Sequence, residues 1–168
     1  MPQTIELPLL GLLKLKPMHG YELRRRLESI VGFTGKVSYG SVYPMLQKLE
    51  QRGQVKKAVV SNEGHERITH HITARGEARF TELMSEPSAP FLLKMLFFQN
   101  IAPSLRRRLL EQQRDQWTRR LDQRRQNKEQ IAHRSVDRYR AALLNRAIDH
   151  LERDIAWIQE LIEKEGQR

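Results

Sequence analysis

The chain of 168 residues contains no cysteine. This absence excludes a disulfide framework, a thiolate nucleophile and a zinc site with cysteine ligands. Long hydrophobic runs are absent too. The longest apolar cluster, residues 91–98, includes Lys94 and is far shorter than the ~20 residues of a membrane-spanning helix. Glu6 and Pro8 interrupt the N-terminal apolar segment, which therefore lacks the pattern of a signal peptide. We expect a cytoplasmic protein with no membrane partner.

Motifs of enzymes and of metal sites are also missing. The sequence has no G-x-S-x-G, P-loop or H-E-x-x-H motif, so we assign no catalytic residue and expect neither enzymatic activity nor a cofactor. His70 and His71 are adjacent in an expected strand, where they point to opposite faces and cannot bind one ion. His65, His133 and His150 lie in other predicted elements, so we expect no metal site. The adjacent pair could still respond to pH, because imidazoles titrate near neutrality.

Positive charge is what the sequence has in excess. The 30 Lys and Arg residues outnumber the 20 Asp and Glu residues and give a net charge of +10. Such a balance favours a polyanionic partner, which can be DNA, RNA or an anionic membrane surface. A basic protein with no such partner is the alternative that charge alone leaves open.

The segment 85-SEPSAP-90 divides the chain, because its two prolines and two serines interrupt the helical patterns. We therefore expect two domains, residues 1–86 and residues 87–168. The first has short elements and frequent turn residues. In the second, glycine is absent until Gly166 and a long helical pattern dominates.

The first domain is predicted to contain short helices and one hairpin. Apolar spacing predicts helices over residues 5–16, 20–31, 41–52 and 74–84. Gly53 stands where a helix C′ glycine is expected, and Thr73 is a suitable N-cap. Three glycines predict a loop over residues 32–40, and apolar alternation predicts a two-stranded hairpin within residues 54–72. Three helices followed by a hairpin is the order of a winged helix-turn-helix, whose third helix enters the DNA major groove.

The third predicted helix carries the main candidates for DNA contact. Val42, Met45, Leu46 and Leu49 form its apolar stripe and leave the opposite face free. No acidic residue occurs from Lys36 to Leu49, so nothing there repels phosphate. We predict base contacts by Gln47 and Lys48. The other candidates at this helix are Lys36, Ser38, Tyr39, Ser41, Tyr43 and Pro44. In the hairpin, His65 and Arg67 are candidates for the minor groove or the DNA backbone. An ordinary solvated helix face is the alternative.

The last predicted helix has the clearest periodicity in the chain. Apolar residues alternate at spacings of three and four, which is an a/d heptad seam typical of a helix that packs against one partner helix. We expect this seam to join two protomers into a homodimer. Its residues are Leu144, Ile148, Leu151, Ile155, Ile158 and Ile162.

Two other features of the second domain have alternative interpretations. Residues 104–140 carry 12 Lys and Arg against 5 Asp and Glu. This predicted helix either contacts DNA flanks or, as we favour, is a solvated connector that attracts DNA at long range. An aromatic cluster forms either dimer core, which we favour, or the wall of an effector pocket. Its residues are Phe91, Phe97, Phe98 and Trp117.

Three segments resemble the PadR family of bacterial transcriptional regulators: 17-PMHGYEL-23, 40-GSVYPMLQKLEQRG-53 and 72-ITARGEARF-80. The back half resembles the longer-tailed members with a virulence-activator-like C-terminal region. The resemblance implies a dimeric winged-helix repressor or activator. It also implies that His19 and Tyr21 face the DNA backbone, and that DNA is contacted by Ser41, Tyr43, Pro44 and Lys48. The chain departs from the family at His70 and His71, where a strand aromatic is usual.

These observations predict a mainly α protein with an N-terminal winged helix-turn-helix and a C-terminal helical dimerisation region. The expected function is sequence-specific binding of double-stranded DNA by a dimeric repressor, on a palindromic operator, with release by a small-molecule effector. A coiled-coil adaptor or structural protein that binds another protein is the alternative. An RNA-binding module fits less well, because the predicted strands carry no aromatic residue for base stacking.

Overall fold

A computed structural model of the protein describes residues 5–34, 42–62, 65–132 and 138–166; within these ranges, the side chains of residues 31–34, 60–62, 65–67 and 130–132 lie outside the description. The chain forms two compact units, Met1–Ile101 and Ala102–Arg168. Along the described parts of the chain, no helix is both long and apolar enough to cross a membrane.

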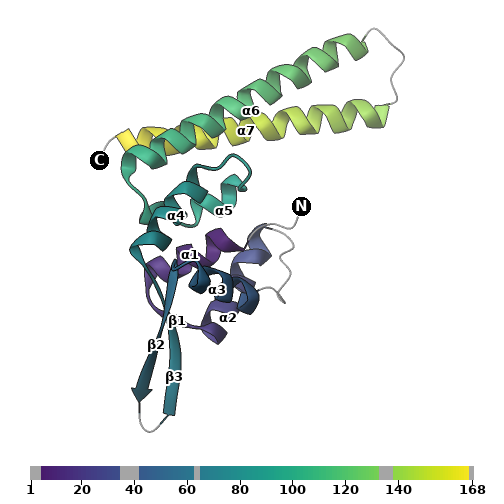
Figure 1. Cartoon of the computed structure of the whole chain (residues 1–168). Coiled ribbons are helices and arrows are strands. Elements are labelled where there is room, and N and C mark those ends of the chain that lie inside the picture. The colour runs from purple at the N-terminus through teal and green to yellow at the C-terminus, as the bar shows by residue number, and fades with distance from the viewer. Residues whose placement is uncertain (1–4, 35–41, 63–64, 133–137, 167–168) are drawn as a thin grey trace. The chain divides into compact units, whose positions relative to one another are not determined.

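The first unit is a winged helix-turn-helix, as the sequence predicts (Figure 1). Its elements are α1 (Glu6–Leu15), β1 (Met18–His19), α2 (Gly20–Thr34), α3 (Val42–Gln51), β2 (Val55–Asn62), β3 (His65–Ile72), α4 (Ala74–Ser85), α5 (Phe91–Met95) and the 3-10 helix η2 (Phe98–Asn100). The prediction of a loop from residue 32 is wrong, because α2 continues to Thr34. The predicted hairpin consists of β2 and β3, which pair in register from Val55 opposite Ile72 to Asn62 opposite His65.

The sheet has three strands in the order β1-β3-β2, all antiparallel. The predicted hairpin β2–β3, here called the wing, is joined by the two-residue strand β1, which sequence periodicity does not show. Met18 pairs with His70 and His19 with Thr69. The start of α2 is thereby fixed to the wing, since Gly20 follows β1 directly.

α1 lies at the centre of the first unit, where it contacts α2, α4, β3 and η2 (Figure 1). Apart from Glu6 and Lys14 it has no charged residue, and its leucines lie on every side, as expected for a helix that other elements surround. Leu9 and Leu10 have no exposed surface. Gly11 lets the ring of Phe97 approach, because a Cβ at this position would lie 2.5 Å from ring atoms of Phe97. The buried Phe97 also packs edge-on against Phe80 of α4, with ring centroids 6.1 Å apart.

Residues 87–101 therefore pack with the first unit, although the sequence places them in the second domain. Lys94 provides a further link, because its Nζ donates to the backbone carbonyl of Glu86 at 2.6 Å, just past the end of α4. The side chain is buried, and this burial lowers the pKa of the Lys94 ammonium. The prolines that interrupt the helical pattern near residue 87 mark the end of α4 rather than the limit of this compact unit.

Two local signals lie where the sequence places them. Thr73 is the N-cap of α4, and its hydroxyl oxygen accepts a hydrogen bond from the backbone N–H of Gly76 at 3.1 Å. Gly53 follows α3 with a φ of 66°, the left-handed conformation that glycine adopts without steric cost. Both predictions are confirmed.

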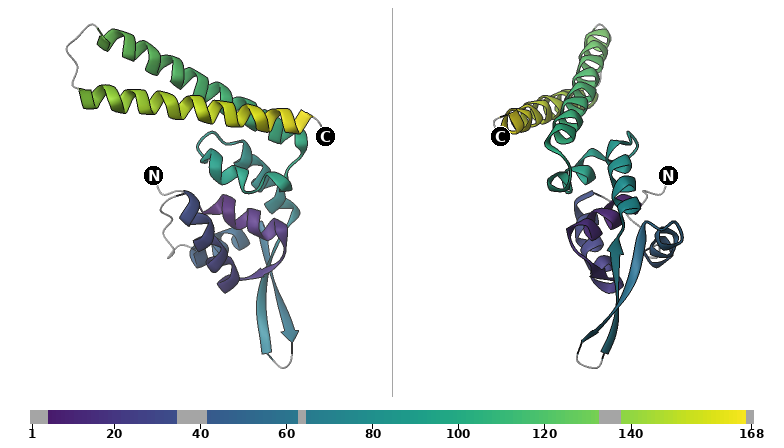
Figure 2. Two further views of the ribbon diagram at one scale, coloured as in Figure 1. Left: turned by 180° about the vertical axis from the view of Figure 1, so that it is seen from behind. Right: turned by 60° about the vertical axis from the view of Figure 1, so that its left-hand side comes forward.

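The second unit is an antiparallel hairpin of α6 (Pro103–Ala132) and α7 (Arg138–Gly166), seen from two further sides in Figure 2. The two helices are linked by Arg106 to Glu165 at 3.1 Å and by Arg125 to Glu152 at 2.7 Å. The heptad seam of α7 lies within this hairpin. Ile158 is fully buried, so the helix that packs against the seam in a single chain is α6.

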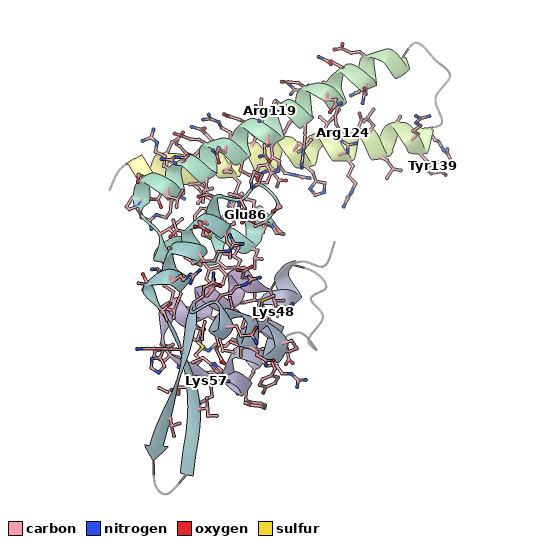
Figure 3. All side chains as sticks on the ribbon, viewed as in Figure 1. Lys48, Lys57, Glu86, Arg119, Arg124 and Tyr139 are labelled. Carbon is pink, nitrogen blue, oxygen red and sulfur yellow. The ribbon has the colours of Figure 1, made fainter. Side chains whose placement is uncertain are left out.

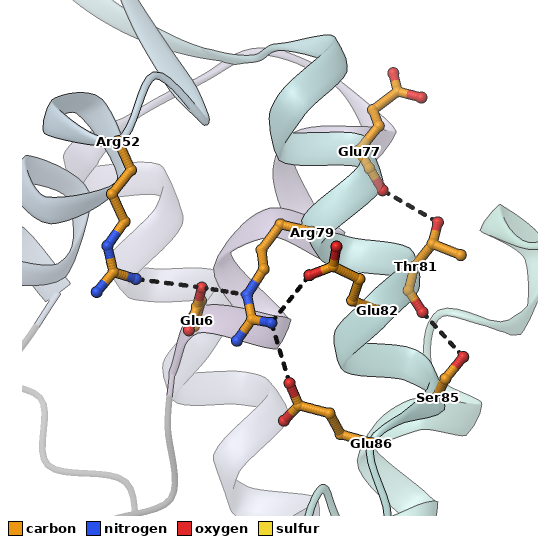
Figure 4. A network of polar contacts seen from close by, with 8 residues as sticks. All are labelled: Glu6, Arg52, Glu77, Arg79, Thr81, Glu82, Ser85 and Glu86. Carbon is orange, nitrogen blue, oxygen red and sulfur yellow. Dashed lines mark hydrogen bonds and ion pairs between the residues drawn. The ribbon is translucent and has the colours of Figure 1, made fainter.

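A network of charges joins three helices of the first unit (Figure 4). Glu6 of α1 is almost fully buried, and its carboxylate accepts a hydrogen bond from Nε of Arg79 at 3.0 Å. Arg52, just past α3, lies 3.8 Å from the same carboxylate oxygen. Arg79 also contacts Glu82 and Glu86, and its hydrogen bond to Glu6 is the main reason why its pKa is raised. A buried carboxylate needs such partners, because its desolvation is otherwise very costly.

Replacing Arg79 by Met should lower the free energy of unfolding by about 2 kcal/mol, since among the described residues Glu6 would keep only the more distant Arg52 as an ion-pair partner. Urea unfolding followed by circular dichroism measures this change. Arg24→Met is the control, because the Arg24–Glu28 pair is exposed and should contribute less than about 1 kcal/mol. Equal effects of the two substitutions would contradict the role given to the buried carboxylate.

Candidate nucleic-acid interface

The two faces of α3 differ sharply in exposure. Val42, Leu46 and Leu49 are buried against the domain. Successive helical residues are 100° apart, so this anchoring turns the opposite side of the helix to solvent. The exposed residues, here called the recognition face, are Tyr43, Pro44, Gln47, Lys48 and Gln51. Four of the five carry hydroxyl, amide or ammonium groups that can hydrogen-bond to a base edge or a phosphate.

A groove of about 600 Å³ runs along the recognition face, where α3, the start of α2 and the wing come together. Aromatic and aliphatic side chains form part of its wall, and a carboxylate, an ammonium group and an imidazole form another part. The lining residues are Gly20, Tyr21, Tyr43, Leu46, Gln47, Glu50, Gln51, Lys57, Ile68 and His70. Tyr21 and Tyr43 are mostly exposed, at 72% and 57%. The structure thus brings together Tyr21, Tyr43 and Gln47 from the predicted contact residues.

Tyr43 lies directly over Gly20, at the N-terminal end of α2. A Cβ on Gly20 would come within 2.9 Å of Cε1 of the Tyr43 ring, so the glycine makes room for the tyrosine. This contact gives a structural reason for the sequence His19-Gly20-Tyr21. His19 itself is tied to the wing, because its Nδ1 lies 2.9 Å from the carbonyl oxygen of Ile68. A hydrogen bond there requires the proton on Nδ1, which leaves Nε2 as the ring nitrogen available to another partner.

Glu50, Lys57 and His70 form a polar cluster on the groove that the sequence patterns do not reveal. Nζ of Lys57 lies 2.7 Å from Oε2 of Glu50, and Nδ1 of His70 lies 3.2 Å from Oε1. Lys57 and His70 are direct cross-strand partners, so both side chains project from the same face of the sheet. Glu50 follows Gln47 by three residues and lies on the same side of α3. In the sequence, the spacing between Gln47 and Glu50 indicates that Glu50 lies beside the recognition face, but it does not indicate the contacts with Lys57 and His70.

Burial governs the titration of His70. Its side chain is 7% exposed, and loss of hydration lowers the pKa of the imidazole below its ordinary 6.5. The carboxylate of Glu50 opposes this shift, whereas the positive charge of Lys57 adds to it. His70 is therefore neutral at pH 7 in the folded protein.

Several predicted DNA contacts lie outside the described residues. Lys36, Ser38, Tyr39 and Ser41 fall in the undescribed segment 35–41. His65 and Arg67 belong to β3, but their side chains are not described. These six remain predictions.

The four residues predicted for an effector pocket are divided between the two units. Phe91 and Phe98 pack edge-on, with centroids 6.1 Å apart, while Phe97 is buried in the core of the first unit. Trp117 lies on α6, in the second unit. An effector pocket formed by these four residues remains a prediction.

His70 should make the stability of the protein sensitive to pH. Well above pH 6.5 the imidazole is neutral in both the folded and the unfolded chain. As pH falls below that value, the unfolded chain binds the proton first, so the free energy of unfolding decreases until the folded pKa is passed. His70→Gln should therefore lose less stability than the wild type between about pH 7 and pH 5. Thermal unfolding at several pH values measures this. Parallel curves for the two proteins would rule out His70 as the cause.

Comparison with known proteins agrees with this architecture. The model of the PadR-like family of transcriptional regulators matches residues 9–82, and the model of the virulence activator alpha C-terminal region matches residues 89–164. Among curated proteins, none matches the chain.

Three solved structures show the range of similarity. A PadR-like regulator from Bacillus cereus is 30% identical over 46% of this chain and 75% of its own, with a TM-score of 0.41. A second one from B. cereus is 21% identical over 98% and 97%, with a TM-score of 0.48. PadR from Bacillus subtilis in complex with operator DNA is 16% identical over 95% and 97%, with a TM-score of 0.43. With both parts of the chain matched by family models, the protein belongs to the PadR-like family of transcriptional regulators.

Proposed function

We propose that this regulator acts in the cytoplasm as a homodimeric repressor that binds a palindromic operator and is released by a small-molecule effector. The observation that carries the DNA-binding part is the recognition face of α3, exposed along the groove between α2 and the wing. A helix with one buried apolar stripe and an opposite face of amide, hydroxyl and ammonium groups suits the major groove. The net charge of +10 attracts the phosphate backbone.

Different residues serve different parts of this contact. Gln47 and Lys48 are exposed in the middle of α3 and are proposed to meet base edges, since amides and ammonium groups pair with the major-groove edges of bases. Tyr43 at the start of α3 and Tyr21 at the start of α2 have free surface for phosphate contacts. Lys57 lines the groove and offers a positive charge from β2 of the wing. Figure 3 labels Lys57 and Lys48.

Dimerisation is proposed to use the surface of α7 that α6 leaves uncovered. Leu151 and Ile155 of the heptad seam are only half-buried in the single chain. On the same helix Leu143 and Trp157 are exposed at 69% and 40%, which is unusual for such large apolar side chains. A two-fold dimer would present two recognition helices ~34 Å apart, one turn of B-DNA.

Selection of bound duplexes from a random DNA pool tests this function, and repeating it with candidate small molecules tests release by an effector. We expect one preferred sequence with two-fold symmetry. Affinity for it should fall steeply as salt rises, because phosphate contacts displace counterions. A coiled-coil adaptor would show neither the preference nor the salt dependence.

The recognition face can be tested directly. Gln47→Ala and Lys48→Ala should each weaken binding to the selected site by about 1–3 kcal/mol and relax the base preference at one position. Fluorescence anisotropy with the selected duplex and with single-base variants measures both effects. Lys164→Ala in α7 is the control for lost positive charge, since it is exposed and lies outside the first unit. If both recognition-face variants bind like this control, α3 does not contact the bases.

The dimer surface calls for a separate test. Leu151→Asp combined with Ile155→Asp should give monomers in sedimentation equilibrium, because two carboxylates would have to be buried between protomers. Circular dichroism must show unchanged helix content, so that loss of the hairpin itself is excluded. A folded variant that still sediments as a dimer would place the interface elsewhere, as at the aromatic residues of the segment 91–98.

A further inference from the structure

We infer that Glu50 is a positioning residue for DNA binding, which holds Lys57 in the groove as a phosphate contact and ties α3 to the wing. The inference rests on the proposed function, because it assigns roles within the same groove. An acidic residue beside the recognition face is unexpected at first, since a carboxylate repels phosphate. The geometry of the cluster explains its presence.

Glu50 contacts both strands of the wing from α3. Its Oε2 is 2.7 Å from Nζ of Lys57 on β2, and its Oε1 is 3.2 Å from Nδ1 of His70 on β3. The side chain of Glu50 is 19% exposed and that of His70 only 7%, so little of the carboxylate faces solvent. The carboxylate thus lies between the recognition helix and the wing, and its ion pair with Lys57 is the direct bond between them.

Lys57 is the member of the cluster that can reach DNA. Its side chain is 51% exposed and lines the groove. An ammonium group has three donors, so one N–H can bind Glu50 while the other two remain for phosphate oxygens. A lysine normally loses much side-chain freedom when it binds a phosphate. The bond to Glu50 already restricts the conformation of the Lys57 side chain before DNA binds. The Lys57 ammonium group in turn neutralises the charge of the Glu50 carboxylate.

This arrangement predicts an effect opposite to that of charge alone. Glu50→Gln raises the net charge from +10 to +11, which by itself should strengthen DNA binding. If Glu50 positions Lys57, the substitution should instead weaken operator binding, and the slope of log affinity against log salt should decrease by about one. Lys57→Met should reduce the slope by the same amount.

The experiment is a double-mutant cycle on the full-length protein with the selected operator duplex, read by anisotropy at several salt concentrations. Glu50→Gln, Lys57→Met and the double variant should lose the same affinity, since Glu50 acts through Lys57. The matched control is the Lys14–Glu77 pair between α1 and α4, also a lysine–carboxylate contact, at 2.8 Å, and not part of the groove lining. Glu77→Gln should bind as tightly as the wild type or slightly more tightly, and Lys14→Met should leave the salt slope unchanged.

The outcomes distinguish the positioning role of Glu50 from the DNA-binding function itself. Tighter or equal binding by Glu50→Gln, or losses that add in the double variant, would overturn the positioning role while leaving the DNA-binding function intact. A wild type with no salt-dependent preference for any duplex would remove the proposed function and this inference together. Should Glu50→Gln fail to fold, a Lys57→Met variant with the same salt slope as Lys14→Met would overturn the role by itself.

Discussion

The rotation of α3 about its own axis is the constraint on which the candidate interface depends. Val42, Leu46 and Leu49 can be buried together in only one rotation of the helix. That rotation directs Gln47 and Lys48 to solvent. Burial of the apolar residues alone sets it, so the polar residues need no contact with the domain. A change in the buried stripe would therefore turn the polar residues away from their partner even if the helix stayed intact. The packing of α3 in the core therefore determines which of its side chains can reach a partner.

Three contacts place the neighbouring elements around that helix. The pairing of β1 with β3 fixes the start of α2 to the wing, and the close approach of Tyr43 to Gly20 fixes it to α3. Glu50 adds a polar link from α3 to both wing strands. The groove consequently has walls from elements far apart in the sequence, held by an apolar core below and by charges at its edge. A partly exposed ion pair contributes little stability, so the value of the Glu50–Lys57 pair lies in geometry rather than in folding energy.

Local signals were predictable from the sequence, and contacts between distant segments were not. The stripe of α3, the N-cap Thr73 and the C′ glycine Gly53 depend on a few neighbouring residues, so periodicity and residue type reveal them. The strand β1 has two residues and exists only because β3, about fifty positions later, offers an edge to pair with. The cluster around Glu50 joins three elements in the same way. The approach of Phe97 to Gly11 is of this kind too, because it packs a residue beyond the prolines near residue 87 against α1.

The heptad seam of α7 shows how a pattern can identify a packing surface without identifying what covers it. A narrow apolar stripe requires one partner helix, and α6 of the same chain supplies it at Ile158 and Ile162, both buried. Those two positions have almost no surface left for a second protomer. Along α6 the last buried residue described is Leu121, whereas the apolar residues of α7 continue to Leu143 at its opposite end. Any pairing of protomers along this helix must therefore use its half-buried and exposed positions rather than the buried residues of the seam.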